Sequence, residues 1–389
     1  MRVIDLFAGC GGFSLGFERA GFESVMALEI DAWASETFAA NHPGAMIITQ
    51  SIRDVPVASL GLPAIDGVIG GPPCQGFSLS GNRDPKDPRN SLFMEFVRYV
   101  RELQPKFFVM ENVLGLLSMK TRDHRPVIEI IFEEFARSGY RLMHVVLNAA
   151  DFGVPQSRQR VFFIGVRTDL PFNVFLLNPM NSNSKSAAVS LWDAISDLPA
   201  LAAGEGAEQQ RYTVPPQNIY QSQMRAGSDV IHNHVAMRHT PRIVERFKQI
   251  NYGQSVKDVS HEHSQRKRGN ASEVSGKVFS QNNMRPYPDR PCPTVAASFQ
   301  SNFIHPYSHR NFTAREGARI QSFPDSYIFR GKRTTMSWEK HLSQYQQVGN
   351  AVPPLLSEAI ASAIREYMAH VGEIRDVLTD EIQQRLSFV

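Results

Sequence analysis

This sequence predicts an α/β fold with a mainly parallel sheet, and three observations support that class. Short apolar runs alternate with helix-like segments through about the first 170 residues. Glycine clusters follow strand-like runs directly, as they do where a chain turns from a strand into a helix. The composition then becomes typical of loops, before helical periodicity returns near the end of the sequence. Helices between short buried strands are typical of a parallel sheet.

The predicted elements of the first part alternate in chain order. Strands are expected at residues 3–7, 24–29, 65–69, 107–110, 142–147 and 161–166. Helices are expected from the first glycine cluster to about residue 22 and at residues 32–41, 92–103 and 128–136. In the third helix, Leu92, Phe96 and Val100 share one face, which predicts that this face is buried.

The chain of 389 residues predicts a division into three parts. Residues 1–177 carry the strand–helix alternation, and residues 178–335 are expected to form a smaller, loop-rich domain. Residues 336–389 are expected to return to the first domain through a helix that starts near Pro353 and ends in a polar tail after Gly372.

Composition excludes several classes of protein. With 41 basic and 38 acidic side chains, the net charge of +3 does not by itself identify a nucleic-acid partner. No apolar run approaches the ~18 residues of a membrane span. The three cysteines lack metal-ligand spacing and cannot form a disulfide framework, so we expect no metal and a reducing cytoplasm.

The glycine cluster at residues 5–13, Asp-Leu-Phe-Ala-Gly-Cys-Gly-Gly-Phe, predicts a ligand-binding turn between a strand and a helix. A dinucleotide site needs a third glycine three residues after Gly11, and Ser14 stands there, which excludes a nicotinamide dehydrogenase. The spacing favours a nucleoside cofactor without a pyrophosphate. Glu29 ends the next strand, where a carboxylate can hold ribose hydroxyls. The alternative is a plain tight turn and a surface acid.

Three further clusters contain reactive side chains. Cys74 follows a strand end and two prolines, an exposed position for a nucleophile, whereas Cys10 and Cys292 are expected to be buried. Glu111 ends another strand and is either a partly desolvated proton donor or a solvated acid. Of Arg158 and Arg160, we expect only one to face Cys74 directly, and the other to make a structural ion pair.

These clusters together resemble the ordered motifs of the cytosine-C5 DNA methyltransferases. The motifs, in chain order, are DLFAGCGGF at 5–13, GPPCQGFS at 71–78, ENV at 111–113, QSRQR at 156–160 and QVGNAVPP at 347–354. The resemblance implies a Rossmann-like S-adenosylmethionine methyltransferase sheet, with the smaller target-recognition domain inserted before the C-terminal helix. It also implies S-adenosyl-L-methionine as cofactor, with S-adenosyl-L-homocysteine as product.

The resemblance assigns a cofactor site to residues that match the family motifs. They are Phe7, Ala8, Gly9, Gly11, Gly12, Glu29, Ile30, Ser51, Ile52, Pro73, Leu92, Asn350 and Val352. Many members carry an aspartate where this chain has Ser51. A serine can accept a hydrogen bond but has no charge, so weaker cofactor affinity is implied at that point.

The resemblance also implies a mechanism. The Cys74 thiolate adds to C6 of cytosine, Glu111 donates to N3, and the methyl group is then captured at C5. Arg158 is implied to hold the cytosine O2, while Arg160 supports Cys74 or its loop. The base must first be flipped out of the duplex, at a cost of a few kcal/mol.

Double-stranded DNA is the implied partner. Between Arg238 and Arg268, eight basic residues against three acidic ones give an excess of 8 − 3 = 5 positive charges, of which half could simply be a solvated face. The residues expected to contact DNA are Gln75, Ser78, Ser80, Arg83, Arg89, Arg238, Arg242, Lys248 and Arg266.

Two rival functions remain. The tRNA-directed relatives share these motifs but carry a Cys-Phe-Thr signature that this chain lacks. A catalytically silent DNA-binding protein on the same fold is disfavoured, because Cys74, Glu111, Arg158 and Asn350 are intact. We expect a monomer, in a bacterial restriction–modification or defence setting with a cognate endonuclease or other defence proteins, or an orphan enzyme.

Overall fold

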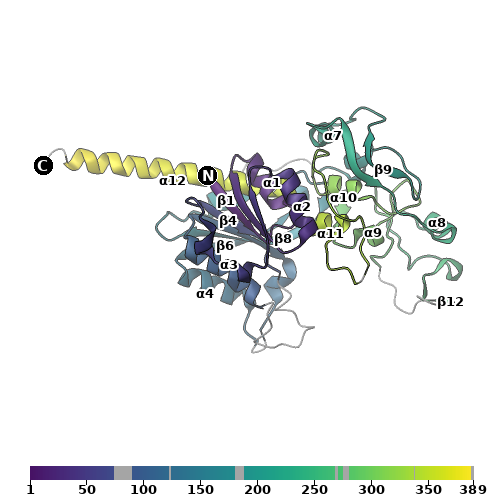
Figure 1. The fold of residues 1–389 in the computed structure, drawn as a ribbon, viewed down its shortest axis with the longest axis horizontal. Coiled ribbons are helices and arrows are strands. Elements are labelled where there is room, and N and C mark those ends of the chain that lie inside the picture. The colour runs from purple at the N-terminus through teal and green to yellow at the C-terminus, as the bar shows by residue number, and fades with distance from the viewer. Residues whose placement is uncertain are drawn as a thin grey trace.

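The computed structural model describes residues 1–73, 90–121, 124–179, 188–267, 270–274, 280–336 and 338–386. These residues form a seven-stranded sheet with the order β3-β2-β1-β4-β5-β8-β6, flanked by helices, and a second region of short elements beside it (Figure 1). The pairs from β3 to β5 are parallel, whereas β8 is antiparallel to both of its neighbours. The predicted α/β class is therefore confirmed.

The bounds of the elements follow the chain. The strands are β1 Arg2–Leu6, β2 Glu23–Glu29, β3 Met46–Thr49, β4 Gly67–Gly70, β5 Phe107–Val113, β6 Tyr140–Asn148, β7 Gln156–Ser157, β8 Gln159–Arg167, β9 Gly206–Arg211, β10 Val230–Val235, β11 Arg266–Lys267, β12 Asn270–Val274 and β13 Cys292–Pro293. The α-helices are α1 Gly12–Arg19, α2 Ala32–Asn41, α3 Asn90–Leu103, α4 Val127–Arg137, α5 Val174–Leu177, α6 Leu191–Ile195, α7 Ile219–Arg225, α8 Pro241–Lys248, α9 Phe299–Asn302, α10 Ala314–Ile320, α11 Gln344–Asn350 and α12 Pro354–Leu386.

The six strands and four helices predicted for the first part are all present, with ends shifted by a few residues. The sequence analysis missed β3, whose residues are exposed or half-buried because β3 is an edge strand of the sheet. An edge strand buries less of its surface, so its apolar pattern is weak.

Two apolar cores cover the two faces of the sheet. On one face, α1 and α12 pack through Phe13, Phe17, Leu356 and Ile360. On the other face, α3 and α4 pack through side chains that include Phe96 and Phe135. The last helix therefore returns to the first domain, as its apolar stripe predicts.

A third core joins α6, α7, α10 and α11 of the second region, and Cys10 and Leu15 of the first region also pack in it. Arg319 is fully buried there, with ion pairs of 3.1 Å to Asp197 and 2.6 Å to Asp325. Pairing and hydrogen bonding at both carboxylates offset the cost of burying these charges. The domain boundaries at 177 and 335 stay predictions, and Tyr345 and Val348 of α11 pack in this third core.

Helix α12 is 33 residues long, and its C-terminal part projects away from the rest of the chain (Figure 1). Among the residues that the structure describes, none of the helices combines the length and apolar character needed to cross a bilayer.

We predict that Gly16→Ala lowers the free energy of unfolding by about 1–3 kcal/mol. An added Cβ at Gly16 would lie 2.3 Å from the Cβ of Ser357 and 2.5 Å from the backbone nitrogen of Glu358, so α1 could no longer approach α12. Denaturant unfolding measures the change. Gly44→Ala is the control, because a Cβ there meets nothing within 4 Å, and equal effects of the two substitutions would contradict the packing argument.

Candidate active site

A cavity of about 390 Å³ lies where β1, β2, β4 and β5 end. Carboxyl ends of parallel strands are where α/β proteins bind ligands. Its lining comes from all the predicted motifs that the structure describes except QSRQR: Asp5, Phe7, Ala8, Gly9, Cys10, Gly12, Phe13, Glu29, Gly71, Pro72, Pro73, Glu111, Asn112, Val113, Leu342, Gln347, Asn350, Ala351 and Val352.

The turn after β1 has an unusual backbone. Phe7, Gly9 and Gly11 have φ values of 61°, 55° and 93°, in the left-handed region that favours glycine. A Cβ at Gly9 would meet nothing within 4 Å, so this residue leaves space for a ligand. At Gly12 a Cβ would lie 2.4 Å from the Val352 carbonyl oxygen. Gly12 therefore permits close packing within the protein, a reason that the sequence pattern did not reveal.

Glu29 holds the turn against the next helix. One carboxylate oxygen accepts a 2.8 Å hydrogen bond from the Gly9 backbone N–H, and the other accepts one of 2.8 Å from that of Asp31. Burial raises the pKa of Glu29, while these backbone bonds act in the opposite direction. A carboxylate oxygen has two lone pairs, so each oxygen can accept a further hydroxyl proton.

Asp5, at the end of β1, has a carboxyl group buried beneath the turn. Its Oδ2 accepts a 2.7 Å hydrogen bond from the Ser14 hydroxyl, while its buried Oδ1 has no partner. Burial raises the pKa of Asp5 to about 7, and the charge of Glu29 adds to this effect. Ser14, which replaces the third glycine of a dinucleotide site, thus has a structural role.

Other predicted cofactor residues lie around the cavity without lining it. The Ile30 side chain is 71% exposed, at the end of β2. Ser51 caps a short helical turn. The next residue, Ile52, is buried, and its backbone carbonyl accepts a 2.9 Å hydrogen bond from Arg98. Leu92 packs against the core beneath α3.

Glu111 and Arg160 form an ion pair of 3.1 Å at the end of β5, and their side chains are only 15% and 17% exposed. Burial raises the pKa of Glu111, and the charges of Arg160 and Arg158 partly offset that rise. Of the two surroundings considered for Glu111, the partly desolvated one therefore describes the structure better than a solvated surface position.

Arg158 is buried, and its guanidinium is bonded within the protein. It is 2% exposed and donates from Nη1 to the carbonyls of Val295 at 2.8 Å and Gly349 at 3.1 Å. Burial lowers the pKa of Arg158 to about 9, and the charge of Arg160 acts in the same direction. Arg160, and not Arg158, is the arginine that pairs with Glu111. Since Cys74 lies outside the described residues, the roles assigned to the two arginines stay predictions.

The loop that leads to Cys74 is anchored beside this pair. The Asn112 side chain donates a 3.0 Å hydrogen bond to the Pro72 carbonyl, which ties the ends of β4 and β5 together. Cys74 itself, and the predicted DNA contacts Gln75, Ser78, Ser80, Arg83 and Arg89, lie outside the described residues. Their roles stay predictions.

The four other predicted DNA contacts lie in the second region. Arg238, Arg242 and Lys248 are exposed, although Lys248 pairs with Glu245 at 2.7 Å. Arg266 is half-buried and donates to the carbonyls of His261 and Glu262, both at 3.4 Å.

Arg246, on the same helix α8, is buried and donates to the carbonyls of His263 and Ser264. It belongs to the basic excess counted from the sequence, but its charge is used within the protein.

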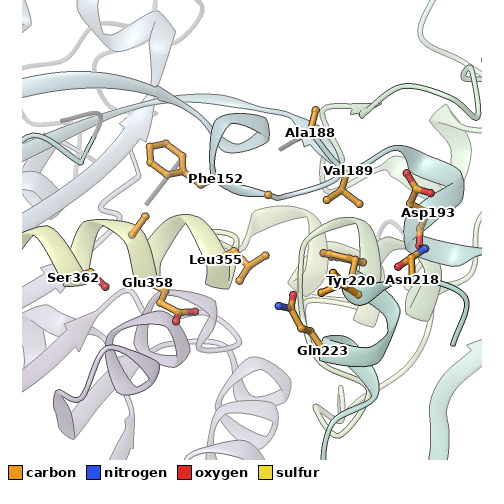
Figure 2. A pocket seen from close by; sticks show the side chains of 13 residues that line it. Phe152, Ala188, Val189, Asp193, Asn218, Tyr220, Gln223, Leu355, Glu358 and Ser362 are labelled. Carbon is orange, nitrogen blue, oxygen red and sulfur yellow. The ribbon is translucent and has the colours of Figure 1, made fainter. Parts of the chain in front are cut away.

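A larger cavity, of about 720 Å³, lies elsewhere (Figure 2). Leu355, Glu358 and Ser362 of α12 line one side of it, and Tyr220 and Gln223 of α7 line the other. It contains none of the predicted site residues, so cavity size alone would have pointed to the wrong place.

Sequence reasoning missed Leu342 and Gln347 as contributors to the site. The Gln347 side chain accepts a 2.6 Å hydrogen bond from Thr37 of α2, and the Leu342 N–H donates to Asp31 at 2.8 Å. Gln347 begins the quoted QVGNAVPP motif, which could have signalled it, whereas Leu342 lies in no motif.

Among the described residues, no group of three or more His, Cys, Asp or Glu side chains is arranged to hold a metal ion.

We predict that Asp5→Asn stabilises the protein in a pH-dependent way. The folded-state pKa of about 7 lies above the unfolded value of 3.8, so the native carboxyl costs nothing below pH 4 and progressively more as the pH rises to 7. Asparagine removes this cost, by about 1–4 kcal/mol at pH 8. Urea unfolding of both proteins from pH 4 to 8 measures it, and a pH-independent difference would contradict the buried-carboxyl interpretation.

Comparisons with known proteins agree with this geometry. Residues 1–366 match the family described as C-5 cytosine-specific DNA methylase. The Type II methyltransferase M.DdeI of Desulfomicrobium norvegicum is 64% identical over 378 residues, covering 97% of this chain and 91% of that protein. The Type II methyltransferase M1.HphI of Haemophilus parahaemolyticus is 39% identical, covering 94% and 86%.

Solved structures agree as well. A prophage-encoded E. coli protein described as a DNA modification methyltransferase superposes with a TM-score of 0.73 at 28% identity, over 95% of this chain and 99% of that one. The Dnmt2 methyltransferase of S. pombe, at 16% identity and a TM-score of 0.56 over 94% and 98%, shares the fold. The chain belongs to the C-5 cytosine-specific DNA methylase family.

Proposed function

We propose that this DNA cytosine-5-methyltransferase flips its target cytosine out of the duplex and methylates it through a covalent Cys74 adduct, with S-adenosyl-L-methionine as methyl donor. The observation that carries the proposal is the half-buried Glu111–Arg160 pair. Its Glu111 lines the cavity formed by the glycine turn and lies next to the strand end that leads to Cys74. An acid held next to an arginine, at the place where a nucleophile enters, suits activation of a polar heterocycle.

The residues of the cavity fit the proposed cofactor. Gly9 leaves open space, and the Glu29 oxygens retain acceptor capacity for two ribose hydroxyls. The exposed Ile30 side chain offers an apolar surface for the adenine ring. The unpartnered Oδ1 of Asp5 supplies an acceptor on the floor of the cavity. When bound, the cofactor supplies an electrophilic methyl group.

The chemistry proceeds in two halves. The Cys74 thiolate would form a bond to C6 while Glu111 donates its proton to N3, so that C5 becomes nucleophilic toward the methyl group that a bound cofactor would supply. A solvent base would then take the C5 proton while the C6–sulfur bond breaks and releases the Cys74 thiolate, and the N3 proton would return to Glu111. Burial raises the pKa of Glu111 and so favours its protonated form, while the charge of Arg160 acts in the opposite direction.

Arg160 takes the role that the resemblance gave to Arg158. Its guanidinium lies within 3.1 Å of Glu111 and can donate to the cytosine O2, where negative charge develops as the thiolate adds. Arg158 instead fixes the carbonyls of Val295 and Gly349, and so joins the second region to the α11 turn that carries Asn350.

We further propose a monomer in the bacterial cytoplasm that acts in a type II restriction–modification system with a cognate endonuclease. The support for the restriction–modification setting is that its bacterial relatives M.DdeI and M1.HphI are Type II methyltransferases.

Methyl transfer from labelled S-adenosylmethionine to unmethylated genomic DNA, with total tRNA in parallel, tests the proposal. We expect label in DNA alone, at C5 of cytosine in a short repeated context on bisulfite sequencing. Cys74→Ala should abolish transfer while cofactor binding persists, because only the covalent step is lost. Label in tRNA alone, or full transfer by Cys74→Ala, would refute the substrate or the mechanism respectively.

Paired substitutions separate the two arginines. Arg160→Gln should lower kcat by about 10²-fold with little change in stability, because a donor to the developing charge is lost. Arg158→Gln should lower the free energy of unfolding by about 1–3 kcal/mol, because two buried carbonyls lose a charged donor. Steady-state kinetics and denaturant unfolding of both variants measure these effects. The reverse pattern would show that Arg158, and not Arg160, contacts the substrate.

A further inference from the structure

The cofactor-binding turn is pressed against two buried side chains on the side away from the cavity. A Cβ at Gly11 would lie 2.4 Å from His42 Nε2 and 2.7 Å from the Tyr327 hydroxyl. The preceding residue, Cys10, accepts a hydrogen bond from that hydroxyl at its backbone carbonyl. The turn therefore contacts a histidine and a tyrosine that lie outside all the quoted motifs.

These side chains form a continuous hydrogen-bonded chain. His42 Nδ1 lies 2.9 Å from both carboxylate oxygens of Glu18, and its Nε2 lies 2.9 Å from the Tyr327 hydroxyl. Tyr327 donates its one hydroxyl proton to the Cys10 carbonyl, and the role of His42 Nε2 toward the same hydroxyl oxygen depends on the imidazole tautomer. His42 also stacks on Phe38, with ring centroids 4.3 Å apart, which fixes the imidazole plane.

The segment that carries Tyr327 is bonded along α2. The Asn41 side chain exchanges 2.9 Å hydrogen bonds with the backbone N–H and carbonyl of Ile328. The Thr37 hydroxyl accepts one of 2.8 Å from the backbone N–H of Arg330. Helix α2 begins next to Glu29, so the helix to which this segment is bonded starts close to the proposed cofactor site.

Tyr327 takes its position from the second region. Phe323 and Phe329, on either side of it, pack in that region's core. The preceding turn is fixed by Arg319, which pairs with Asp325 at 2.6 Å, and by Arg315, which donates to the Pro324 carbonyl at 2.9 Å. The second region therefore places a hydroxyl group against the back of the cofactor-binding turn.

We propose that Tyr327, acting through His42 and the Cys10 carbonyl, is a positioning residue for the cofactor-binding turn, so that cofactor affinity depends on the docked second region. This inference rests on the proposed cofactor. It makes the second region part of the cofactor site as well as the bearer of predicted DNA contacts.

Isothermal titration of the full chain with S-adenosylhomocysteine tests the proposal. Tyr327→Phe keeps the ring and removes only the hydroxyl, and we expect the Kd to rise about two- to tenfold. In the methyl-transfer assay, the KM for S-adenosylmethionine should rise similarly while kcat is retained. His42→Phe, which keeps the stacking on Phe38, should weaken binding in the same direction.

Tyr140→Phe is the matched control. Tyr140 is equally buried, and its hydroxyl donates a 2.7 Å hydrogen bond to the Pro105 carbonyl, at the other end of the sheet from the cavity. If Tyr327→Phe and His42→Phe bind as tightly as the wild type, and only lose stability as Tyr140→Phe does, the positioning role is refuted. Failure of the wild type to bind would instead refute the proposed cofactor.

Discussion

Parallel pairing of β1 with β2 on one side and with β4 on the other is the constraint on which the site depends. It brings the ends of successive strands to one edge of the sheet, because parallel strands share a direction. The glycine turn, Glu29, the prolines before Cys74 and Glu111 lie far apart in the sequence, yet each follows or ends one of these strands. A small number of hydrogen bonds, such as those from Gly9 and Asp31 to Glu29, then lock the turns to one another.

The second region is bonded into this edge at several points. Arg158 joins Val295 to Gly349, and the Gln156 side chain donates to Gln321 and accepts from the Val295 N–H, both at 2.7 Å. The short strands β7 and β13 pair beside these contacts. Buried polar groups are costly when they lose their partners, so these hydrogen bonds favour one relative placement of the two regions. A rigid placement suits an enzyme that must align cofactor, base and nucleophile within fractions of an ångström.

Much of this arrangement was predictable from the sequence, and the errors have identifiable causes. The strands of the sheet and the turns between them follow from short-range patterns of apolar residues and glycine. The sequence pattern could not determine which way the two arginines face, because their facing depends on the path of the chain. On a regular strand, residues two apart face the same side, but Arg158 lies in the break between β7 and β8 and turns into the interior. The basic excess between Arg238 and Arg268 was likewise a count of charges along the sequence. It included Arg246, which the structure places in the interior.

The sequence by itself determined the α/β class, the family motifs and the residue types that could react, because these depend on neighbours a few positions apart. Only the tertiary structure decided that Arg160 pairs with Glu111, that Gly12 is needed against Val352, and that Tyr327 touches the turn at Gly11. Tyr327 and Cys10 are 317 residues apart in the chain. A contact over such a separation leaves no periodicity or spacing to read, since it exists only once distant parts of the chain have folded into the same core.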